Sequence, residues 1–446
     1  MAKLFGTDGI RGIAGQYPID VETGKRLGYF LVGFCKDRGK STDIITGRDT
    51  RESGEILEKA VSAGILAAGG TVKSAGEIPT PGAAFLAKNQ GCGAGVVISA
   101  SHNPFDYNGF KIFSGDGYKF SEAEEIEIED KILDKAAELS IPDLECLNII
   151  ENAKNDFRTF LQNIVHDKGK LKKYSIVIDC SNGAASGIAP TLFNDLGVKT
   201  DIIFAEPDGK NINDNCGSQH TGGLSKRVIE KNADIGLAFD GDADRLIAVD
   251  ETGTALTGDQ IIAICAKMLH KRNELNNNVV VTTVMSNMGL GAALKEMDID
   301  HEKTGVGDRL VMEKMREIGS SIGGEDSGHI IFANNHTTGD GILSALQLLN
   351  AMAFSGKPLS KLADIMKIFP QVLINVKVKN KPEITGIPAI KQEMDNAETA
   401  LGDHGRILVR YSGTEPLCRI MVEGKDREEI EKYAKNIADI IEKELN

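Results

Sequence analysis

The chain has 446 residues, 41% of them hydrophobic, and a formal net charge of −14 at pH 7. At roughly 100–200 residues per domain, this length predicts about three or four domains. The acidic balance argues against a protein that binds nucleic acid through a broad basic face. The seven cysteines are scattered and form no CxxC pair, so we expect a reducing, cytoplasmic compartment. The sequence shows neither a signal-peptide pattern nor an apolar stretch of about 18 residues, so we expect no membrane span.

Three stretches of the chain share one order of predicted elements. In each, an apolar strand runs into a polar, glycine-containing turn, then an amphipathic helix, then a second strand; the stretches are residues 43–80, 174–204 and 278–301. Units of this kind predict helices layered on parallel strands. Their uneven spacing favours one domain repeated with different insertions, and convergence on a common βα unit is the alternative.

The last part of the chain follows a different pattern. Three segments alternate apolar and polar residues like half-exposed strands, and an amphipathic helix closes the chain: residues 372–380, 405–413, 418–424 and 427–445. They predict a small α+β domain after a linker near Pro370. We therefore expect four domains, at residues 1–155, 156–254, 255–368 and 369–446.

The segment VVISASHNPFDYNGFKIF, residues 96–113, joins a β-branched strand to a polar turn. Turns of this kind lie at the carboxyl edge of a parallel sheet, where ligand sites form. There Ser101 could act as a nucleophile or phosphate carrier, His102 could steer or deprotonate it, and Lys111 could reach the same phosphate. The alternative is an ordinary polar turn capped by serine and asparagine.

The segment LAFDGDADRLIAVD, residues 237–250, places three carboxylates on one short loop. Alternate carboxylates can converge on one hard cation, and Mg²⁺ accepts such ligands while leaving room for phosphate oxygens. Without a cation, three packed carboxylates would repel one another. We therefore predict a Mg²⁺ site at Asp240, Asp242 and Asp244, with Arg245 holding an anion or an aspartate; a polar turn with acidic caps is the alternative.

Two further turns offer groups that recognise a sugar phosphate. In IGGEDSGHIIF, residues 322–332, Glu325 and Ser327 suit sugar hydroxyls and His329 suits general acid or base chemistry. In RYSGTEPLCRI, residues 410–420, the composition is that of a phosphate cradle: Arg410, Ser412, Gly413, Thr414 and Arg419. A hairpin-like turn with a structural histidine, and a capped surface turn, are the respective alternatives.

Three glycine-rich segments carry weaker signals. FGTDGIRG (5–12) presents Arg11, TGRDTRESG (46–54) presents Arg48 and Arg51, and KTGVGDRLV (303–311) presents Asp308 and Arg309. Taken alone, each is expected to be a loop with a surface salt bridge. The remaining histidines show no metal-ligand spacing and are expected to be surface or structural residues.

In combination, these segments resemble the α-D-phosphohexomutase family, in the same order and nearly end to end from FGTDGIRG to RYSGTEP. The resemblance implies an α/β fold: three similar domains with mixed sheets and a smaller C-terminal α+β domain around a central cleft. It also implies that Ser101 carries the catalytic phosphate and that Mg²⁺ binds this phosphoserine together with Asp240, Asp242 and Asp244.

The resemblance implies roles for the other segments too. Glu325 and Ser327 would grip sugar hydroxyls, and Arg11 and Lys111 would contact the reacting phosphate or assist proton transfer, with His102 and His329 as further catalytic candidates. The non-transferred phosphate would be held by Arg410, Ser412, Gly413, Thr414 and Arg419.

The segments FGTDGIRG, VGDR (306–309) and RYSGTEPLCRIMVE favour the amino-sugar branch of the family, although Asp326 departs from its usual glutamine. The expected reaction converts glucosamine 6-phosphate into glucosamine 1-phosphate through a bisphosphorylated sugar and feeds UDP-N-acetylglucosamine synthesis. The partners expected are this hexosamine phosphate and the bisphosphorylated intermediate, with no nucleic acid or membrane, and the resemblance allows a homodimer. The alternatives are a phosphoglucomutase or phosphomannomutase, a Mg²⁺-dependent sugar-phosphate phosphatase, and a non-catalytic phosphosugar-binding protein.

Overall fold

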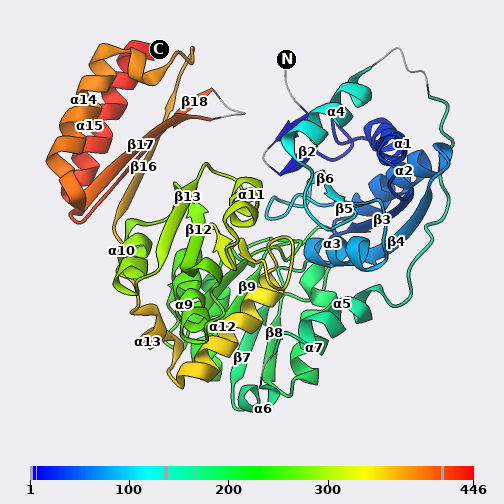
Figure 1. Ribbon diagram of the computed structural model, residues 1–446, viewed down its shortest axis with the longest axis horizontal. Helices are drawn as coiled ribbons and strands as arrows, with labels where there is room; N and C mark the ends of the chain where they lie inside the picture. Colours follow the sequence, from blue (N-terminus) through cyan, green and yellow to red (C-terminus); the bar gives the residue numbers. More distant parts are fainter. Residues whose placement is uncertain (1–3, 7, 135–138, 166, 413–415, 446) are drawn as a thin grey trace. The chain divides into compact units, whose positions relative to one another are not determined.

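The computed structural model describes residues 4–6, 8–134, 139–165, 167–412 and 416–445 (Figure 1). The chain forms two compact units. The first comprises Met1–Ser286 and Met297–Ile365, and the second comprises Asn287–Glu296 and Met366–Asn446. The first unit contains three mixed sheets, and the second contains one smaller antiparallel sheet.

The first sheet has the strand order β1-β2-β6-β5-β3-β4. Its central strand β3 runs parallel to β4 and β5, whereas β6 pairs antiparallel with β5 and β2. Its strands are β1 (Phe5–Gly6), β2 (Gly9–Ile13), β3 (Asp43–Arg48), β4 (Thr71–Glu77), β5 (Ala94–Ile98) and β6 (Tyr107–Ser114). The helices of this region are α1 (Val21–Asp37), α2 (Gly54–Ala67), α3 (Thr80–Asn89), α4 (Glu122–Leu133) and α5 (Ala153–Gln162).

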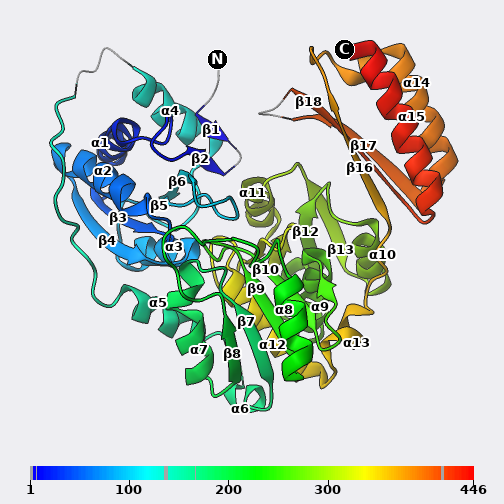
Figure 2. The same cartoon turned by 180° about the vertical axis from the view of Figure 1, so that it is seen from behind.

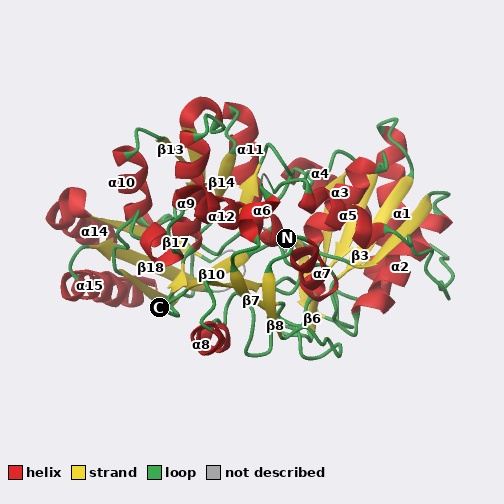
Figure 3. Cartoon of the chain, turned by 90° about the horizontal axis from the view of Figure 1, so that it is seen from below, coloured by secondary structure: helices red, strands yellow, loops and turns green. Residues whose placement is uncertain are grey.

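Helices cover both faces of this sheet (Figure 3). Successive side chains of a strand point to opposite faces. Accordingly, Ile44 packs in the cluster that contains residues of α1 and α2, and Ile45 packs in the cluster that contains residues of α3. Both strand residues are fully buried, which explains why β3 reads as an apolar run and not as an alternating pattern.

The second sheet, β11-β10-β9-β7-β8, repeats the arrangement of the first. Strand β7 runs parallel to β8 and β9, and β10 pairs antiparallel with β9. Its strands are β7 (Ser175–Asp179), β8 (Lys199–Ile203), β9 (Ile235–Phe239), β10 (Leu246–Asp250) and β11 (Ala255–Leu256). The helices are α6 (Lys168–Leu171), α7 (Ala189–Asp195) and α8 (Gly222–Lys231), with a 3₁₀ turn at Ala184–Gly187.

The third sheet, β13-β12-β14-β15, follows the same plan. Strand β12 runs parallel to β13 and β14, and β15 pairs antiparallel with β14. Its strands are β12 (Val279–Thr283), β13 (Asp300–Thr304), β14 (Ile322–Gly324) and β15 (Ile330–Phe332). The helices of this part of the chain are α9 (Gly258–Lys271), α10 (Met288–Glu296, which belongs to the second unit), α11 (Asp308–Ile318), α12 (Gly341–Ser355) and α13 (Leu359–Ala363).

This shared plan gives three equivalent turns. In each sheet, the first parallel strand is followed by a βα loop, and a later parallel strand turns directly into its antiparallel neighbour. The three strand-to-strand turns are residues 99–106, 240–245 and 325–329, which contain the ASHNP, DGDADR and EDSGH segments. The expected α/β class with three similar mixed sheets is therefore confirmed.

The second unit contains an antiparallel sheet of order β16-β18-β17, with two helices on one face (Figure 2). Its strands are β16 (Gln371–Lys377), β17 (Gly405–Tyr411) and β18 (Leu417–Gly424), and its helices are α14 (Pro388–Leu401) and α15 (Arg427–Leu445). The predicted small α+β part is therefore confirmed. Among the residues described, no helix has both the length and the apolar character needed to cross a membrane.

Candidate active site

Ser101 lies fully buried in the turn between β5 and β6, with a left-handed backbone φ of 53°. Its Oγ donates to Asp240 Oδ2 at 2.6 Å and lies 3.2 Å from His102 Nδ1. Burial, together with the positive charges of Arg245 and Arg11, lowers the pKa of His102 to about 4. The imidazole is therefore neutral at neutral pH. The hydrogen bond to Asp240 joins the serine of the first turn to an aspartate of the second turn.

The three aspartates of the second turn form one buried group. Their side chains are at most 2% exposed, and one oxygen of each lies within 4.8 Å of the others. Within the described residues, Oδ1 of Asp242 and Oδ1 of Asp244 have no hydrogen-bond partner. Burial and the neighbouring Asp244 and Asp242 raise the pKa of Asp240 well above its ordinary value. Buried carboxylate oxygens without a hydrogen-bond donor fit a hard divalent cation such as Mg²⁺.

Lys111, on β6, reaches into this group. Its Nζ lies 2.7 Å from Asp242 Oδ2, 3.0 Å from Asp244 Oδ2 and 3.1 Å from Asp8 Oδ2. Burial opposes its charge, but these three carboxylates raise the pKa of Lys111 well above its ordinary value. Lys111 therefore remains a cation and partly neutralises the aspartates.

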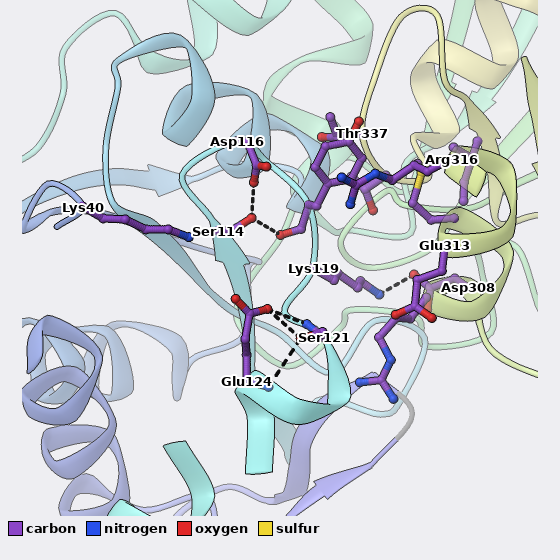
Figure 4. A pocket seen from close by; sticks show the side chains of 15 residues that line it. Lys40, Ser114, Asp116, Lys119, Ser121, Glu124, Asp308, Glu313, Arg316 and Thr337 are labelled. Carbon is purple, nitrogen blue, oxygen red and sulfur yellow. Dashed lines mark hydrogen bonds and ion pairs between the residues drawn. The ribbon is translucent and has the colours of Figure 1, made fainter. Parts of the chain in front are cut away.

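Arg11, on β2, connects the N-terminal segment to the serine turn. Its guanidinium pairs with Asp8 and donates to the carbonyl of Ala100 at 3.3 Å and to Asn103 Oδ1 at 3.2 Å. Asp8 also pairs with Lys119, which in turn contacts Asp308 Oδ2 at 2.5 Å (Figure 4). The expectation of a surface salt bridge in this segment is therefore wrong, because Arg11 and Asp8 belong to a partly buried network.

His329 is the last residue of the third turn and lies between two carboxylates. Its Nε2 is 3.2 Å from Asp308 Oδ2, and its Nδ1 is 3.6 Å from Asp244 Oδ1. Burial lowers the pKa of His329, but Asp308 and Asp244 outweigh it and raise this pKa to about 10. The imidazole is therefore positively charged at neutral pH and can donate a proton or stabilise negative charge.

A cavity of about 300 Å³ in the first unit is lined in part by Asp8, Lys119, Asp308 and His329. Its wall includes the exposed Ser327 and the partly buried Glu325, whose Oε1 accepts the Gly307 N–H at 3.2 Å. Burial and the nearby Asp308 raise the pKa of Glu325 above its ordinary value. A cavity of this size with convergent polar groups is typical of a small-molecule site.

The phosphate-cradle residues lie in the second unit. Arg410 on β17 and Arg419 on β18 are directly paired across the sheet, and burial together with Arg419 lowers the pKa of Arg410. Ser412 is buried, and Lys381 Nζ donates to its carbonyl at 2.6 Å. Gly413 and Thr414 lie outside the described residues. Paired arginines repel each other, so this arrangement favours a bound anion.

Sequence analysis missed three residues of these networks. Asp8 pairs with three cations, Arg11, Lys111 and Lys119. Lys119 pairs with Asp8 and Asp308, and Lys381 donates to the Ser412 carbonyl. Asp8 stands inside the FGTDGIRG segment, where its spacing from Arg11 was the available signal. Lys119 and Lys381 stand in no motif, because only the folded chain brings their partners together.

Four family models match the chain, each described as part of phosphoglucomutase/phosphomannomutase. Alpha/beta/alpha domain I matches residues 2–138, domain II residues 155–253, domain III residues 257–369, and the C-terminal domain residues 373–440. The match thus extends over most of the chain.

Curated full-length relatives share about half of the sequence. The chain is 49% identical to the phosphoglucosamine mutase of Syntrophus aciditrophicus, covering 100% of both chains. It is 49% identical to that of Syntrophobacter fumaroxidans and 51% identical to that of Desulforapulum autotrophicum, covering 99% of each chain in both comparisons.

Solved structures share the fold at lower identity. A phosphoglucomutase/phosphomannomutase family protein from Burkholderia thailandensis aligns with a TM-score of 0.83 at 23% identity, covering 100% of this chain and 99% of the other. The phosphoglucomutase pp63/parafusin from Paramecium aligns with a TM-score of 0.77 at 16% identity, covering 99% and 95%.

Proposed function

Because the chain belongs to the phosphoglucosamine mutase family of α-D-phosphohexomutases, we propose that it interconverts glucosamine 6-phosphate and glucosamine 1-phosphate. The product would feed UDP-N-acetylglucosamine synthesis. The observation that carries the proposed site is the 2.6 Å contact of Ser101 Oγ with Asp240 Oδ2, inside a buried group of three carboxylates.

Ser101 is the proposed phosphoryl carrier. In the first half-reaction, the free hydroxyl oxygen of the sugar phosphate bonds to the phosphorus on Ser101, and the bond from that phosphorus to Ser101 Oγ breaks. The sugar hydroxyl loses its proton and the serine oxygen gains one, so a bisphosphorylated sugar and a free serine result. The second half-reaction reverses these steps with the other phosphate, so no inorganic phosphate is released.

Asp240, Asp242 and Asp244 would hold Mg²⁺ together with the phosphorylated serine. Oδ1 of Asp242 and Oδ1 of Asp244 accept no hydrogen bond within the described residues, which supports this assignment. When bound, the ion supplies positive charge that neutralises the transferring phosphoryl group. Asp242→Asn should therefore weaken Mg²⁺ binding, which calorimetric titration of the protein with MgCl₂ measures.

The chain's own charges would guide the transfer. Arg245 lies at the wall of the cavity, with its Nε 3.9 Å from Asp240 Oδ2 and 3.8 Å from Asp244 Oδ1. Arg11 donates to the serine turn at the Ala100 carbonyl, and Lys111 contacts Asp242 and Asp244. Charged His329 is suited to stabilise negative charge on the transferring phosphoryl group, and neutral His102 lies 3.2 Å from Ser101 Oγ, where it can orient that oxygen. In such transfers, positioning and electrostatic stabilisation supply most of the catalysis.

Two sets of residues would bind the substrate. Glu325 and Ser327 line the cavity and offer a carboxylate and a hydroxyl to the sugar. Arg410, Arg419 and Ser412, with the neighbouring Gly413 and Thr414, would hold the phosphate that is not being transferred. Arginine and backbone donors bind the phosphate group and do not contact a particular face of the sugar ring. The same residues can therefore bind the intermediate in both of its orientations.

The chain is further proposed to act in the cytoplasm as a homodimer. Its seven free cysteines, six of them buried, support a reducing compartment. Size-exclusion chromatography with light scattering tests the dimer, and a monomeric mass at micromolar concentration would contradict it.

Phosphorus NMR of the phosphorylated protein with Mg²⁺ tests the reaction. Glucosamine, glucose and mannose 6-phosphates are compared in parallel samples. The glucosamine 6-phosphate signal is expected to convert fastest to the 1-phosphate without free phosphate. Faster conversion of another sugar would overturn the amino-sugar preference, and release of inorganic phosphate alone would indicate a phosphatase.

A further inference from the structure

Arg51 holds the turn that carries Ser101 through the backbone of that turn and not through Ser101 Oγ. Arg51, in the βα loop after β3, is 2% exposed. Its Nε donates to Asp49 Oδ2 at 2.9 Å. Its other donors reach three backbone carbonyls of the turn and one at the start of β6: those of Ser101 at 3.0 Å, Asn103 at 2.8 Å and Pro104, and that of Tyr107 at 3.0 Å. One planar guanidinium thus joins both arms of the turn.

The same pair also holds the amide side of the serine. Asp49 accepts the Ser99 hydroxyl at 2.6 Å, and Ser99 Oγ accepts the Ser101 N–H at 2.9 Å. Because Arg51 binds the Ser101 carbonyl and Asp49 acts on its N–H through Ser99, both backbone polar groups of Ser101 are fixed. A non-glycine residue keeps a φ of 53° only where its surroundings determine it this strongly.

Contacts with the second sheet's loops extend the brace. Asn213 donates to the carbonyls of Ser101 at 2.9 Å and Asn103 at 3.0 Å. The Thr50 hydroxyl donates to the Asn182 carbonyl at 2.6 Å. The brace therefore sets the serine turn against the neighbouring aspartate turn, where a Cβ on Gly241 would lie 2.6 Å from the Ser101 carbonyl.

Arg51 is unsuited to bind the substrate phosphate itself. Each guanidinium N–H has an acceptor within the protein, so none is left for a ligand. Its charge is also paired with Asp49, and both side chains are fully buried. The expectation of a surface salt bridge in the TGRDTRESG segment is therefore wrong for Arg51.

We propose that Arg51 is a positioning residue for phosphoryl transfer. Its five-donor fork holds the serine turn so that Ser101 Oγ faces the aspartates. The planar guanidinium is required because it donates to five separated acceptors at once. A lysine would keep the positive charge but cannot reach all five. The inference rests on the proposed phosphoserine chemistry, although it concerns the backbone around Ser101 and not the choice of sugar.

The test compares Arg51→Lys with Arg48→Lys. Arg48 lies on the same segment, but its guanidinium pairs with Glu58 at 2.7 Å instead of with the carbonyls of the serine turn, so it is the matched control. Arg51→Lys should lower kcat roughly 10- to 100-fold, because small misplacements of a reacting atom have effects of this size. Its KM should change less than about two-fold. Arg48→Lys should leave both constants within about two-fold of the unmodified protein.

A second readout is independent of sugar preference. The phosphoserine signal in phosphorus NMR follows phosphorylation of Ser101 by glucose 1,6-bisphosphate, and in Arg51→Lys this rate should fall in parallel with kcat. Equal kcat and phosphorylation rates in the two lysine variants would overturn the proposal. A rise in KM with unchanged kcat would also overturn it.

If Arg51→Lys does not fold, Asn213→Gly tests whether hydrogen bonds to the serine turn support kcat. Asn213 has a φ of 59°, which glycine adopts readily, so the substitution removes two hydrogen bonds to the turn without backbone strain. A fall in kcat with unchanged KM supports bracing of the turn. Kinetics like those of the unmodified protein would contradict it.

Discussion

Ser101 combines full burial with a left-handed backbone, and its Oγ is the group that the proposed reaction needs. Ser101→Ala removes this oxygen and leaves the backbone hydrogen bonds in place. Turnover should fall to background while the melting temperature stays close to that of the unmodified protein. Ser62→Ala is a control, since the Ser62 hydroxyl on α2 is buried and has no hydrogen-bond partner within the described residues. Substantial turnover by Ser101→Ala would remove the phosphoserine from the mechanism.

His336 shows how a single buried ring makes stability depend on pH. Its Nε2 lies 3.0 Å from the Pro81 carbonyl, and its Nδ1 accepts the Thr337 N–H at 2.7 Å. Burial lowers its pKa to about 4, with the Pro81 carbonyl opposing this shift. A second ring proton would have to face the Thr337 N–H, so the neutral form is the one that fits.

The sign of this effect follows from the two states. Between pH 6.5 and about 4 the unfolded chain binds the proton and the folded chain does not. Stability should therefore be lost as the pH falls through this window, by at most roughly 3 kcal/mol. Urea unfolding at several pH values should show a shallower loss for His336→Gln than for the control His220→Gln, whose ring is exposed. Equal slopes in the two variants would contradict the assignment.

At the scale of elements, helices α1 and α2 pack through glycines. A Cβ on Gly28 would lie 2.0 Å from the Val61 carbonyl oxygen, and one on Gly64 would lie 2.0 Å from the Lys25 carbonyl oxygen. These glycines allow the two backbones to approach closely. The apolar face of α1 was readable from its sequence pattern, but this close approach was not, because it depends on which helix lies opposite.

Gly28→Ala should consequently destabilise the first unit by about 1–3 kcal/mol, since the added methyl group forces the helices apart. Gly33→Ala in the same helix is the matched control, because a Cβ there meets nothing within 4 Å. It should raise stability by up to about 1 kcal/mol through helix propensity. Thermal unfolding measures both; a neutral Gly28→Ala would show that α1 shifts freely against α2.

Some parts of the fold could be predicted from the sequence and others could not. Strands β3, β7 and β12 are buried on both faces and were visible as apolar runs before glycine-containing turns. The antiparallel partner strands that make each sheet mixed were implied only by the family resemblance. The roles of Arg51 and Lys119 were not predictable, because an arginine or lysine in a polar loop shows the same local sequence pattern whether its partner groups are nearby in the sequence or distant in it.

At the scale of the whole molecule, the proposed phosphate-binding residues belong to the second compact unit. Arg419 in the second unit should bind the phosphate that does not react, so its contribution is the same in the ground and transition states. Arg419→Ala should therefore raise KM about ten-fold or more with little change in kcat. Arg427→Ala, at the exposed start of α15, should leave KM unchanged. Steady-state kinetics distinguishes them, and a large fall in kcat alone would contradict the assignment.

The predicted division into four domains is finer than the division of the structure into two compact units. The borders at residues 155, 254 and 368 stay a prediction, because the three sheets of the first unit pack as one body. Limited proteolysis at these borders would test it.

The three equivalent strand-to-strand turns have a consequence for the origin of the enzyme. One turn holds the proposed phosphoryl carrier, another the carboxylate group and the third the residues proposed to bind the sugar. An ancestor with one such sheet would have possessed one of these abilities and could not have catalysed the isomerisation. In such a history, the reaction became available only after several copies had been fused in one gene and each turn had specialised, so selection for mutase activity followed the duplications and did not drive them.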